Sequence, residues 1–250
     1  MQDSPVKRFY DGLHANHYPV KDITGLESTT KRFRTCLSLL RKYQPRDLLE
    51  VGFENPSLSV ILANSLHVNY CGVDISVPSV QGARSKGLNA VLLDVSQEQL
   101  PLETHSVDVV YCSEVLEHLY NPDFAVEEFK RVLRSDGKIL ITTPNLGAWY
   151  NRLALLVGIQ PVHTEVSTIR IVGRRFRILG QGNFPVGHVR AFTLRGLLDF
   201  LALHNLVVVE LQGYGLESVK RFRYSEACLA KFPALASGFI VLATPGSNSQ

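Results

Sequence analysis

The chain has 250 residues, 45% of them hydrophobic and 20% charged, which is enough apolar material to bury a full core in a single domain, residues 1–250. Its net charge is +3 without a long run of one sign, so bulk electrostatics give no reason to expect nucleic acid as a partner. The four cysteines form no C-x-x-C pair, and neither a signal-peptide core nor a run of about 18 apolar residues occurs. This argues against a disulfide framework or a transmembrane segment and predicts a cytoplasmic protein.

The first half of the chain alternates between helices and strands. Apolar residues at helical spacing from Leu26 to Leu40 predict an amphipathic helix ahead of the first strand. The pattern then predicts strands near 47–51, 69–73, 89–93, 107–112 and 138–142, with helices near 57–66, 78–86 and 122–134 between them. Such alternation favours right-handed crossovers and a mainly parallel sheet.

The later elements complete this sheet. Asn121 and Pro122 suit the start of the helix at 122–134, and Ser135-Asp136-Gly137 is expected to end it and turn the chain into the next strand. A helix capped by Thr193 then leads to strands at 206–211 and 239–243. The expected fold class is α/β, with a doubly wound, mainly parallel seven-stranded sheet.

Acidic or polar side chains follow four of these strands at their carboxyl ends, where open α/β sheets bind ligands. Glu50 ends the first strand, Asp74 the second and Asp94 the third, and Ser113 follows the fourth. A carboxylate after the second strand can accept both hydroxyls of a ribose, and one after the third can accept from the amine of an adenine. Each aspartate taken alone is more simply a cap of the next turn, but their shared position favours a ligand site.

Residues 50–56, Glu-Val-Gly-Phe-Glu-Asn-Pro, join the first strand to the next helix. A strand, a tight turn at Gly52 and a helix N-terminus form the usual nucleotide cradle. Such a loop is normally richer in glycine than this one. Asn55 can cap the helix with Pro56 in its first turn, so the start of the helix is preserved.

Five stretches of sequence carry a more specific signal. They are LLEVGF at 48–53, YCGVDIS at 70–76, AVLLDVS at 90–96, GHVRAFTLRGL at 187–197 and, as the most specific, the run at 106–145 with its E-V-L-E-H, R-V-L, Asp-Gly and T-P-N motifs in order. Together they resemble the class I S-adenosylmethionine-dependent methyltransferases of type 11 or 23, a group that includes ubiquinone-biosynthesis enzymes. The resemblance covers roughly residues 27–211 and implies a Rossmann-like sheet whose last strand is antiparallel.

The resemblance also implies a cofactor, S-adenosylmethionine, and methyl transfer to a small-molecule, lipid-linked or glycan-linked acceptor. It would place Asp74, with Ile75 beside it, at the ribose of the cofactor. Asp94 and Val95 would meet the adenine. Three further residues would surround the methionine end, namely Glu50, Gly52 and Ser113.

The first motif departs from the family pattern, which carries glycine at the positions of Glu54 and Pro56. A carboxylate at Glu54 could oppose the cofactor's own carboxylate, at a cost of up to roughly 4 kcal/mol for charges about 4 Å apart in an effective dielectric of about 20. It could also point to solvent or contact the cofactor's ammonium group. The alternative function is therefore a non-catalytic, methyltransferase-like binding or scaffold protein that has lost the cofactor.

Two histidines, His118 and His188, are candidate catalytic bases because imidazole titrates near neutral pH. Glu114, Glu117 and His118 have the spacing i, i+3 and i+4, which puts them on one face of a helical turn. Some methyltransferases with similar E-x-x-E-H motifs bind a divalent metal, whereas many metal-free members share the same string. If a metal binds here, His188 would be the fourth ligand of a magnesium, manganese or zinc ion. A simple contact between Glu114 and His118, and a surface or capping role for each histidine, are the alternatives.

Two segments outside the sheet are expected to shape the site. Residues 146–187 are the expected substrate or lid insertion, because a connection longer than about 15 residues is usually functional. Their arginines could bind phosphate or carboxylate, touch an anionic membrane surface peripherally, or lie on a solvated hairpin; they are Arg170, Arg174, Arg175 and Arg177. Residues 1–26, with Tyr10, His14 and Tyr18, are expected to cap the cofactor or to pack against the sheet.

Overall fold

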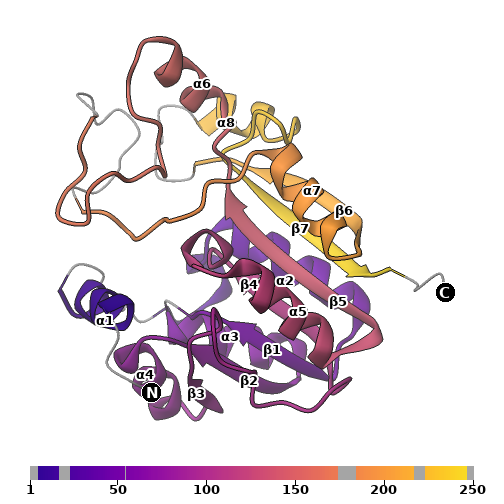
Figure 1. Ribbon diagram of the computed structural model, residues 1–250. Coiled ribbons are helices and arrows are strands. Elements are labelled where there is room, and N and C mark those ends of the chain that lie inside the picture. Colours follow the sequence, from indigo (N-terminus) through magenta and orange to yellow (C-terminus); the bar gives the residue numbers. More distant parts are fainter. Residues whose placement is uncertain (1–4, 17–22, 54, 174–183, 217–222, 247–250) are drawn as a thin grey trace. The chain divides into compact units, whose positions relative to one another are not determined.

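The computed structural model describes residues 5–16, 23–53, 55–173, 184–216 and 223–246. Seven strands form one sheet in the order β3-β2-β1-β4-β5-β7-β6 (Figure 1). They are β1 (Asp47–Val51), β2 (Asn69–Asp74), β3 (Ala90–Leu92), β4 (Val107–Ser113), β5 (Leu133–Pro144), β6 (Leu206–Tyr214) and β7 (Gly238–Pro245). The pairs β1–β2, β1–β4 and β2–β3 are parallel, whereas β6 and β7 are antiparallel. The expected seven-stranded, mainly parallel α/β fold is confirmed.

The helices of this fold are α1 (Pro5–Asn16), α2 (Lys31–Tyr43), α3 (Pro56–Leu66), α4 (Val77–Ser85), α5 (Pro122–Val132), α6 (Trp149–Leu156), α7 (Leu194–Leu203) and α8 (Arg223–Leu229). Three of the starts expected from the sequence are confirmed, because each cap oxygen accepts a backbone N–H of the first turn. Asn55 caps α3, Asn121 caps α5 and Thr193 caps α7.

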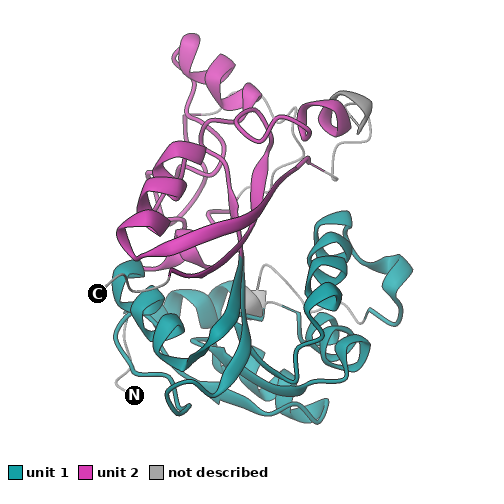
Figure 2. Ribbon diagram, turned by 90° about the vertical axis from the view of Figure 1, so that its right-hand side faces the viewer, with its two compact units in different colours: residues 1–113, 121–140 teal, residues 114–120, 141–250 magenta. Residues whose placement is uncertain are grey.

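The chain divides into two compact units, shown in teal and magenta in Figure 2. Unit 1 comprises residues 1–113 and 121–140, and unit 2 comprises residues 114–120 and 141–250. In unit 1, Phe53, Val80, Ala83 and Ala90 form one buried cluster. In unit 2, the first six residues of β7 are buried. That all 250 residues form a single domain stays a prediction.

The helix expected from Leu26 begins later, at Lys31. Residues 26–28 form a 3-10 turn, in which the Thr29 hydroxyl donates to the Leu26 carbonyl at 2.6 Å. Thr30 has an extended backbone, and its side chain accepts from the Phe33 N–H at 3.2 Å. This cap fixes the first turn of α2 and prevents the helix from extending backwards.

The turn expected at residues 135–137 is absent, because these residues lie within β5. Helix α5 ends at Val132, and Leu133 is already extended and buried. The Arg134 side chain pairs with Asp47 and Asp108 within unit 1, which holds this stretch along the sheet. The local Asp-Gly turn signal is therefore overridden by tertiary ion pairs.

Helices α1, α6 and α8 were not expected from the sequence. Helices α6 and α8 have only 8 and 7 residues, and short helices give a weak periodic signal. Helix α1 has 12 residues, so its length does not explain why it was missed. Across the described part of the chain, no helix combines the length and the apolar character needed to cross a membrane.

Candidate functional site

Within unit 1, the end of β1 carries a buried carboxyl group beside a tight turn. Glu50 is buried, and its Oε2 accepts from the Tyr70 hydroxyl at 2.6 Å. Gly52 has a φ of +70°, a left-handed conformation that glycine adopts without steric cost, and its N–H donates to the Val73 carbonyl at 2.8 Å. The chain can therefore turn sharply from β1 towards α3.

The pKa of Glu50 is raised to about 7. Burial is the main cause, because it disfavours the charged carboxylate, and the nearby charge of Asp74 adds to it. The hydrogen bond from Tyr70 opposes this shift without cancelling it. The end of β1 is thus a place where a positively charged ligand group would be stabilised.

Asp74, at the end of β2, holds the backbone on both of its sides. Its Oδ2 accepts from the Phe53 N–H at 2.8 Å, and its Oδ1 accepts from the Ser76 N–H at 2.7 Å. The carboxylate is 8% exposed, and Ile75 beside it is half-buried. Asp74 therefore caps the following turn, as the simpler interpretation of the sequence expected.

Asp94 follows β3 and organises a tight turn. Its Oδ1 accepts from the Ser96 N–H at 2.9 Å, and its Oδ2 accepts from the Gln97 side chain at 2.7 Å. Its own N–H donates to Glu98. Asp94 is half-buried, Val95 is buried, and Ser113 at the end of β4 is half-buried.

An interaction that the sequence analysis missed joins α1 to α4. The Asp11 carboxylate accepts from the Val77 N–H at 2.8 Å and also pairs with Lys7. The N–H group at the start of α4 is thus satisfied by a residue 66 positions away in the chain. No short-range pattern could have revealed this contact. The side chain of His14 and all of Tyr18 lie outside the described residues.

Within unit 2, Glu114 does not share a helical face with Glu117 and His118. Its φ is +55°, and the 3-10 turn η2 begins only at Leu116. Its Oε1 accepts from the hydroxyls of Thr142 at 2.9 Å and Tyr214 at 2.8 Å. The left-handed backbone at Glu114 breaks the helical spacing that the sequence suggested, so its carboxylate turns towards β5 and β6.

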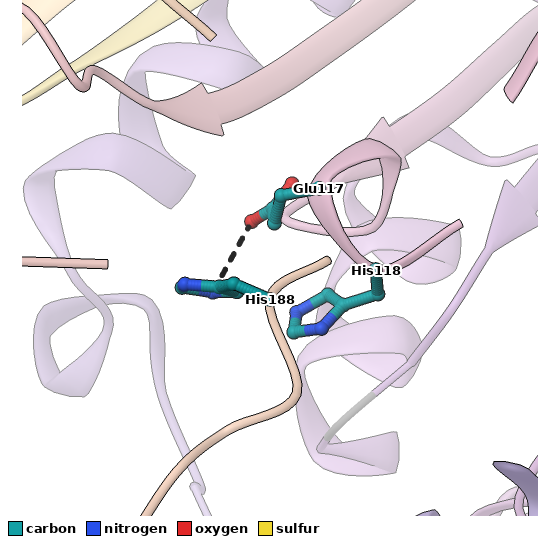
Figure 3. A group of neighbouring side chains, drawn as sticks. All are labelled: Glu117, His118 and His188. Carbon is teal, nitrogen blue, oxygen red and sulfur yellow. Dashed lines mark ion pairs between the residues drawn. The ribbon is translucent and has the colours of Figure 1, made fainter. Parts of the chain in front are cut away.

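Glu117, His118 and His188 lie together, with one potential ligand atom of each within 4.8 Å of the others. Figure 3 shows Glu117 and His118 projecting from the same turn, with His188 approaching from another segment of the chain. The His188 Nε2 is 4.0 Å from Glu117 Oε1, and both side chains are at least nine-tenths buried. Thr143 donates to the other Glu117 oxygen at 3.0 Å. Of the four residues that the sequence predicted to converge, these three lie together and Glu114 does not.

The imidazole of His118 is held in its neutral form. Its pKa is lowered to about 4, mainly because burial penalises the charged ring and also because His188 lies beside it. Its Nδ1 lies 3.1 Å from the Gly187 carbonyl, which can only accept, so Nδ1 carries the proton. The Nε2 lone pair can therefore act as a base or as a metal ligand.

Two residues that the sequence analysis did not single out complete this cluster. The rings of His163 and His188 have centroids 5.3 Å apart. The Glu165 carboxylate accepts from three consecutive backbone N–H groups, those of Val186 and Gly187 at 2.8 Å and of His188 at 3.3 Å. Glu165 is the only acid between residues 146 and 190, and this isolation was the one signal the sequence offered.

Some expected residues lie outside the described part of the chain, so their roles stay predictions. These are Glu54 in the first loop and Arg174, Arg175 and Arg177 in the connection after β5. Pro56 is described, and it occupies the first turn of α3 behind the Asn55 cap.

Comparisons with known proteins point to one family. A family model for a methyltransferase domain matches residues 49–141. A Mycobacterium tuberculosis protein named "Probable S-adenosylmethionine-dependent methyltransferase" is 35% identical over 125 residues, which are 48% of this chain and 43% of that protein. A Mycolicibacterium smegmatis protein with a similar name is 33% identical over 173 residues, 67% of this chain and 63% of its own length. The chain thus spans about half the length of the curated relatives it matches.

Solved structures agree on the fold. The crystal structure of an S-adenosylmethionine dependent methyltransferase from Mesorhizobium loti matches with a TM-score of 0.57 and 15% identity, covering 88% of this chain and all of that one. A possible histamine N-methyltransferase from Thermotoga maritima matches with a TM-score of 0.56 and 15% identity, covering 85% of this chain and 88% of that one. At such identities the likeness concerns the fold alone.

Proposed function

We propose that this chain, which belongs to the class I S-adenosylmethionine-dependent methyltransferases, transfers a methyl group from S-adenosylmethionine to a small-molecule, lipid-linked or glycan-linked acceptor. The observation that carries the proposal is the row of carboxyl groups at Glu50, Asp74 and Asp94. They lie in the last two residues of β1, at the last residue of β2 and just after β3, which are three neighbouring parallel strands of unit 1. Ligands of open α/β sheets bind at this end of the strands.

The side chains around β1 and β2 fit such a cofactor chemically. Glu50 and Asp74 are buried carboxyl groups on adjacent strands, and a cationic ligand group would offset the cost of ionising Glu50. The hydroxyls of Ser76 and Ser79 are buried, and they have no hydrogen-bond partner within the described residues. A ligand with an ammonium group at one end and hydroxyls at the other would satisfy this combination.

The residues of unit 1 would divide the cofactor between them. Asp74 and Ile75 would hold the ribose, Asp94 and Val95 would hold the adenine, and Glu50, Gly52 and Ser113 would hold the methionine end. Bound S-adenosylmethionine supplies a methyl group that its sulfonium already activates. The protein's own residues then have to orient the acceptor, exclude water and take up a proton where the acceptor carries one.

His118 and His188 are the proposed proton acceptors. The Nε2 of His118 is unprotonated when its Nδ1 donates to Gly187, and Glu165 fixes the backbone at His188. Residues 146–187 are proposed as the element that selects the acceptor. Residues 1–26 are proposed as a cap, and the contact between Asp11 and Val77, three residues after Asp74, supports this role.

Cofactor binding is expected to depend on the charge of Asp94. Titration calorimetry with S-adenosylmethionine and with its demethylated product should give heat for the wild-type chain. Asp94→Asn keeps an acceptor for the Ser96 N–H but loses the charge, so both ligands should bind about ten- to a hundredfold more weakly. The exposed Asp136→Asn serves as the control.

The same titration decides between the two functions. If the wild-type chain gives neither heat nor a thermal shift at millimolar cofactor, the protein is a non-catalytic binding or scaffold relative. If it binds and Asp94→Asn binds equally well, the adenine lies elsewhere and this assignment of the strand ends is wrong.

As the alternative to proton transfer by the histidines, we propose that Glu117, His118 and His188 hold a divalent cation. Two imidazoles and one carboxylate suit zinc or manganese better than magnesium, which prefers oxygen ligands. His188→Ala should lower the zinc affinity measured by competition with a chelating dye by about tenfold or more. Glu114→Gln should leave it unchanged, because the Glu114 carboxylate is bound to Thr142 and Tyr214.

Two outcomes of this zinc titration would contradict the three-ligand site. Equal losses in His188→Ala and Glu114→Gln would restore Glu114 as the fourth ligand that the sequence spacing suggested. Unchanged affinity in His188→Ala would leave the cluster with a proton-transfer role alone.

A further inference from the structure

The last turn of α6 exposes apolar side chains that folded proteins usually bury. Leu156 is 82% exposed and Val157 68%, and Leu153 and Leu155 are more than half exposed. In the first turn of the same helix, Tyr150 and Asn151 are buried, Asn151 completely. Helix α6 is thus anchored at its start and exposed at its end.

The loop that follows α6 has the same character. The Gln160 N–H donates to the Gly173 carbonyl at 3.1 Å and closes the loop at residues 160–173. Between these ends, Val166 is 68% exposed and Ile169 80%, and Arg170 is exposed beside them. The two ends of the loop are therefore joined by a hydrogen bond, and the loop exposes two aliphatic side chains next to an arginine.

A single buried base holds the helix and the loop together. Asn151 accepts from the Val162 N–H at 2.7 Å and donates to the Val162 carbonyl at 3.4 Å. Val162 also packs with Ala148 and Tyr150 in a buried cluster.

We call the exposed side chains of this helix and loop the α6–loop surface, comprising Arg152, Leu153, Leu155, Leu156, Val157, Val166, Ile169 and Arg170. More than half of the large hydrophobic side chains that are exposed in the described residues lie between Leu153 and Val189.

The charge of this region is strongly positive. Residues 146–190 contain six arginines and one acid, Glu165, giving a net charge of +5 in a chain whose total is +3. The Glu165 carboxylate is also occupied, since it accepts backbone N–H groups of residues 186–188. Of these arginines, Arg152 and Arg170 belong to the α6–loop surface, which therefore combines aliphatic side chains with positive charge.

We propose that the α6–loop surface docks on an anionic lipid bilayer. Aliphatic side chains enter the boundary between headgroups and acyl chains, while arginines pair with lipid phosphates. The exposed apolar residues of the α6–loop surface are Leu, Val and Ile, which offer no ring on which a nucleic-acid base could stack, and the exposed Phe184 is not part of this surface. The combination fits a lipid surface better than a single-stranded nucleic acid.

Docking on a bilayer would also indicate which class of methyl acceptor the protein uses, and this step rests on the proposed function. Val166 of the α6–loop surface directly follows Glu165, which holds the backbone N–H of His188. A bilayer at this surface would bring a lipid-linked acceptor to the part of the chain that carries the histidine cluster. A lipid-linked acceptor is thus favoured over a freely soluble one.

Sedimentation of the full chain with vesicles tests the docking without any use of the cofactor. The wild-type chain should sediment with vesicles of mixed phosphatidylcholine and phosphatidylglycerol, and its partition coefficient should fall as salt is added. Leu156→Ser combined with Ile169→Ser should lower the coefficient by about tenfold or more. Arg170→Gln should lower it about fivefold. The matched control is Leu203→Ser on α7, where a leucine is 75% exposed outside this surface.

Several results would overturn the proposal. One is a wild-type chain that stays in the supernatant, or that binds pure phosphatidylcholine equally well. Another is an equal loss in Leu203→Ser. Binding of a single-stranded RNA oligomer that is lost in Arg170→Gln would assign the surface to nucleic acid, and a dimer that dissociates in the double variant would assign it to a second copy of the chain. A failed docking together with normal cofactor titration would leave the proposed methyl transfer intact.

Discussion

Replacing Glu50 with glutamine is expected to stabilise the folded protein by about 3 kcal/mol near pH 8 and to have almost no effect near pH 4.5. The pKa of Glu50 is raised from 4.5 to about 7, chiefly by burial. Between these two values the folded state keeps a proton that the unfolded chain has released. Stability from this group is therefore present below pH 4.5 and is lost as the pH rises through 7.

Urea unfolding at a series of pH values measures this difference. The wild-type curve should fall towards alkaline pH, and the Glu50→Gln curve should fall less. Glu103→Gln, which removes an exposed carboxylate of the same unit, is the control and should follow the wild type. If stability depends on pH in the same way in the wild type and in Glu50→Gln, ionising the buried carboxyl group of Glu50 does not lower stability.

The same substitution should weaken the binding of S-adenosylmethionine. If Glu50 receives the cofactor's ammonium group, the carboxylate ionises on binding, and glutamine cannot supply that charge. Stability and binding would then change in opposite directions. Such a conflict between stability and activity is what a functional residue shows, whereas a purely structural carboxyl group would affect stability alone.

The positions of the strand ends and helix starts could be predicted from the sequence because they depend on nearby residues. The first three strands are short apolar runs, and the acidic residues at 50, 74 and 94 lie at or within two residues of their ends. The caps Asn55, Asn121 and Thr193 act within three residues of their own position. Local patterns of this kind survive folding unless a tertiary contact opposes them.

The contacts that could not be predicted join residues far apart in the chain. Asp11 satisfies the N–H of Val77, and Arg134 pairs with Asp47, 87 residues away. Neither partner belongs to a short motif. The Asp-Gly sequence at 136–137 did predict a turn, but the ion pairs of Arg134 keep this stretch in β5.

The E-x-x-E-H motif shows why a prediction from residue spacing was wrong for one residue, Glu114. It assumed a continuous helical turn from Glu114 to His118, but the left-handed backbone at Glu114 precedes that turn. Glu117, His118 and the distant His188 converge nevertheless. His163 and Glu165 also lie at this cluster. They belong to the connection at residues 146–187, whose sequence has no regular periodicity from which their position could be predicted.

Replacing His118 with asparagine is expected to remove a loss of stability at acidic pH. The pKa of His118 is lowered from 6.5 to about 4, first by burial and then by the neighbouring His188. As the pH falls from 6.5 towards 4, the unfolded chain gains a proton that the folded state refuses, so wild-type stability falls by about 3 kcal/mol. Asparagine can still donate from Nδ2 to the Gly187 carbonyl but does not titrate in this range.

The titration of Glu50 changes stability in the opposite direction over much of the same pH range, so its contribution must be separated from that of His118. In the Glu50→Gln background, urea unfolding in the presence of a chelator should show stability falling steeply below pH 6.5, and adding His118→Asn should flatten that fall. His67→Asn, at an exposed position whose left-handed backbone asparagine accepts, is the control. The groups that shift the pKa of Glu50 do not include His118, and those that shift the pKa of His118 do not include Glu50, so the two effects should add. If stability still falls below pH 6.5 in the His118→Asn protein, another group with a lowered pKa causes the fall, and the surroundings of His118 do not hold its imidazole neutral.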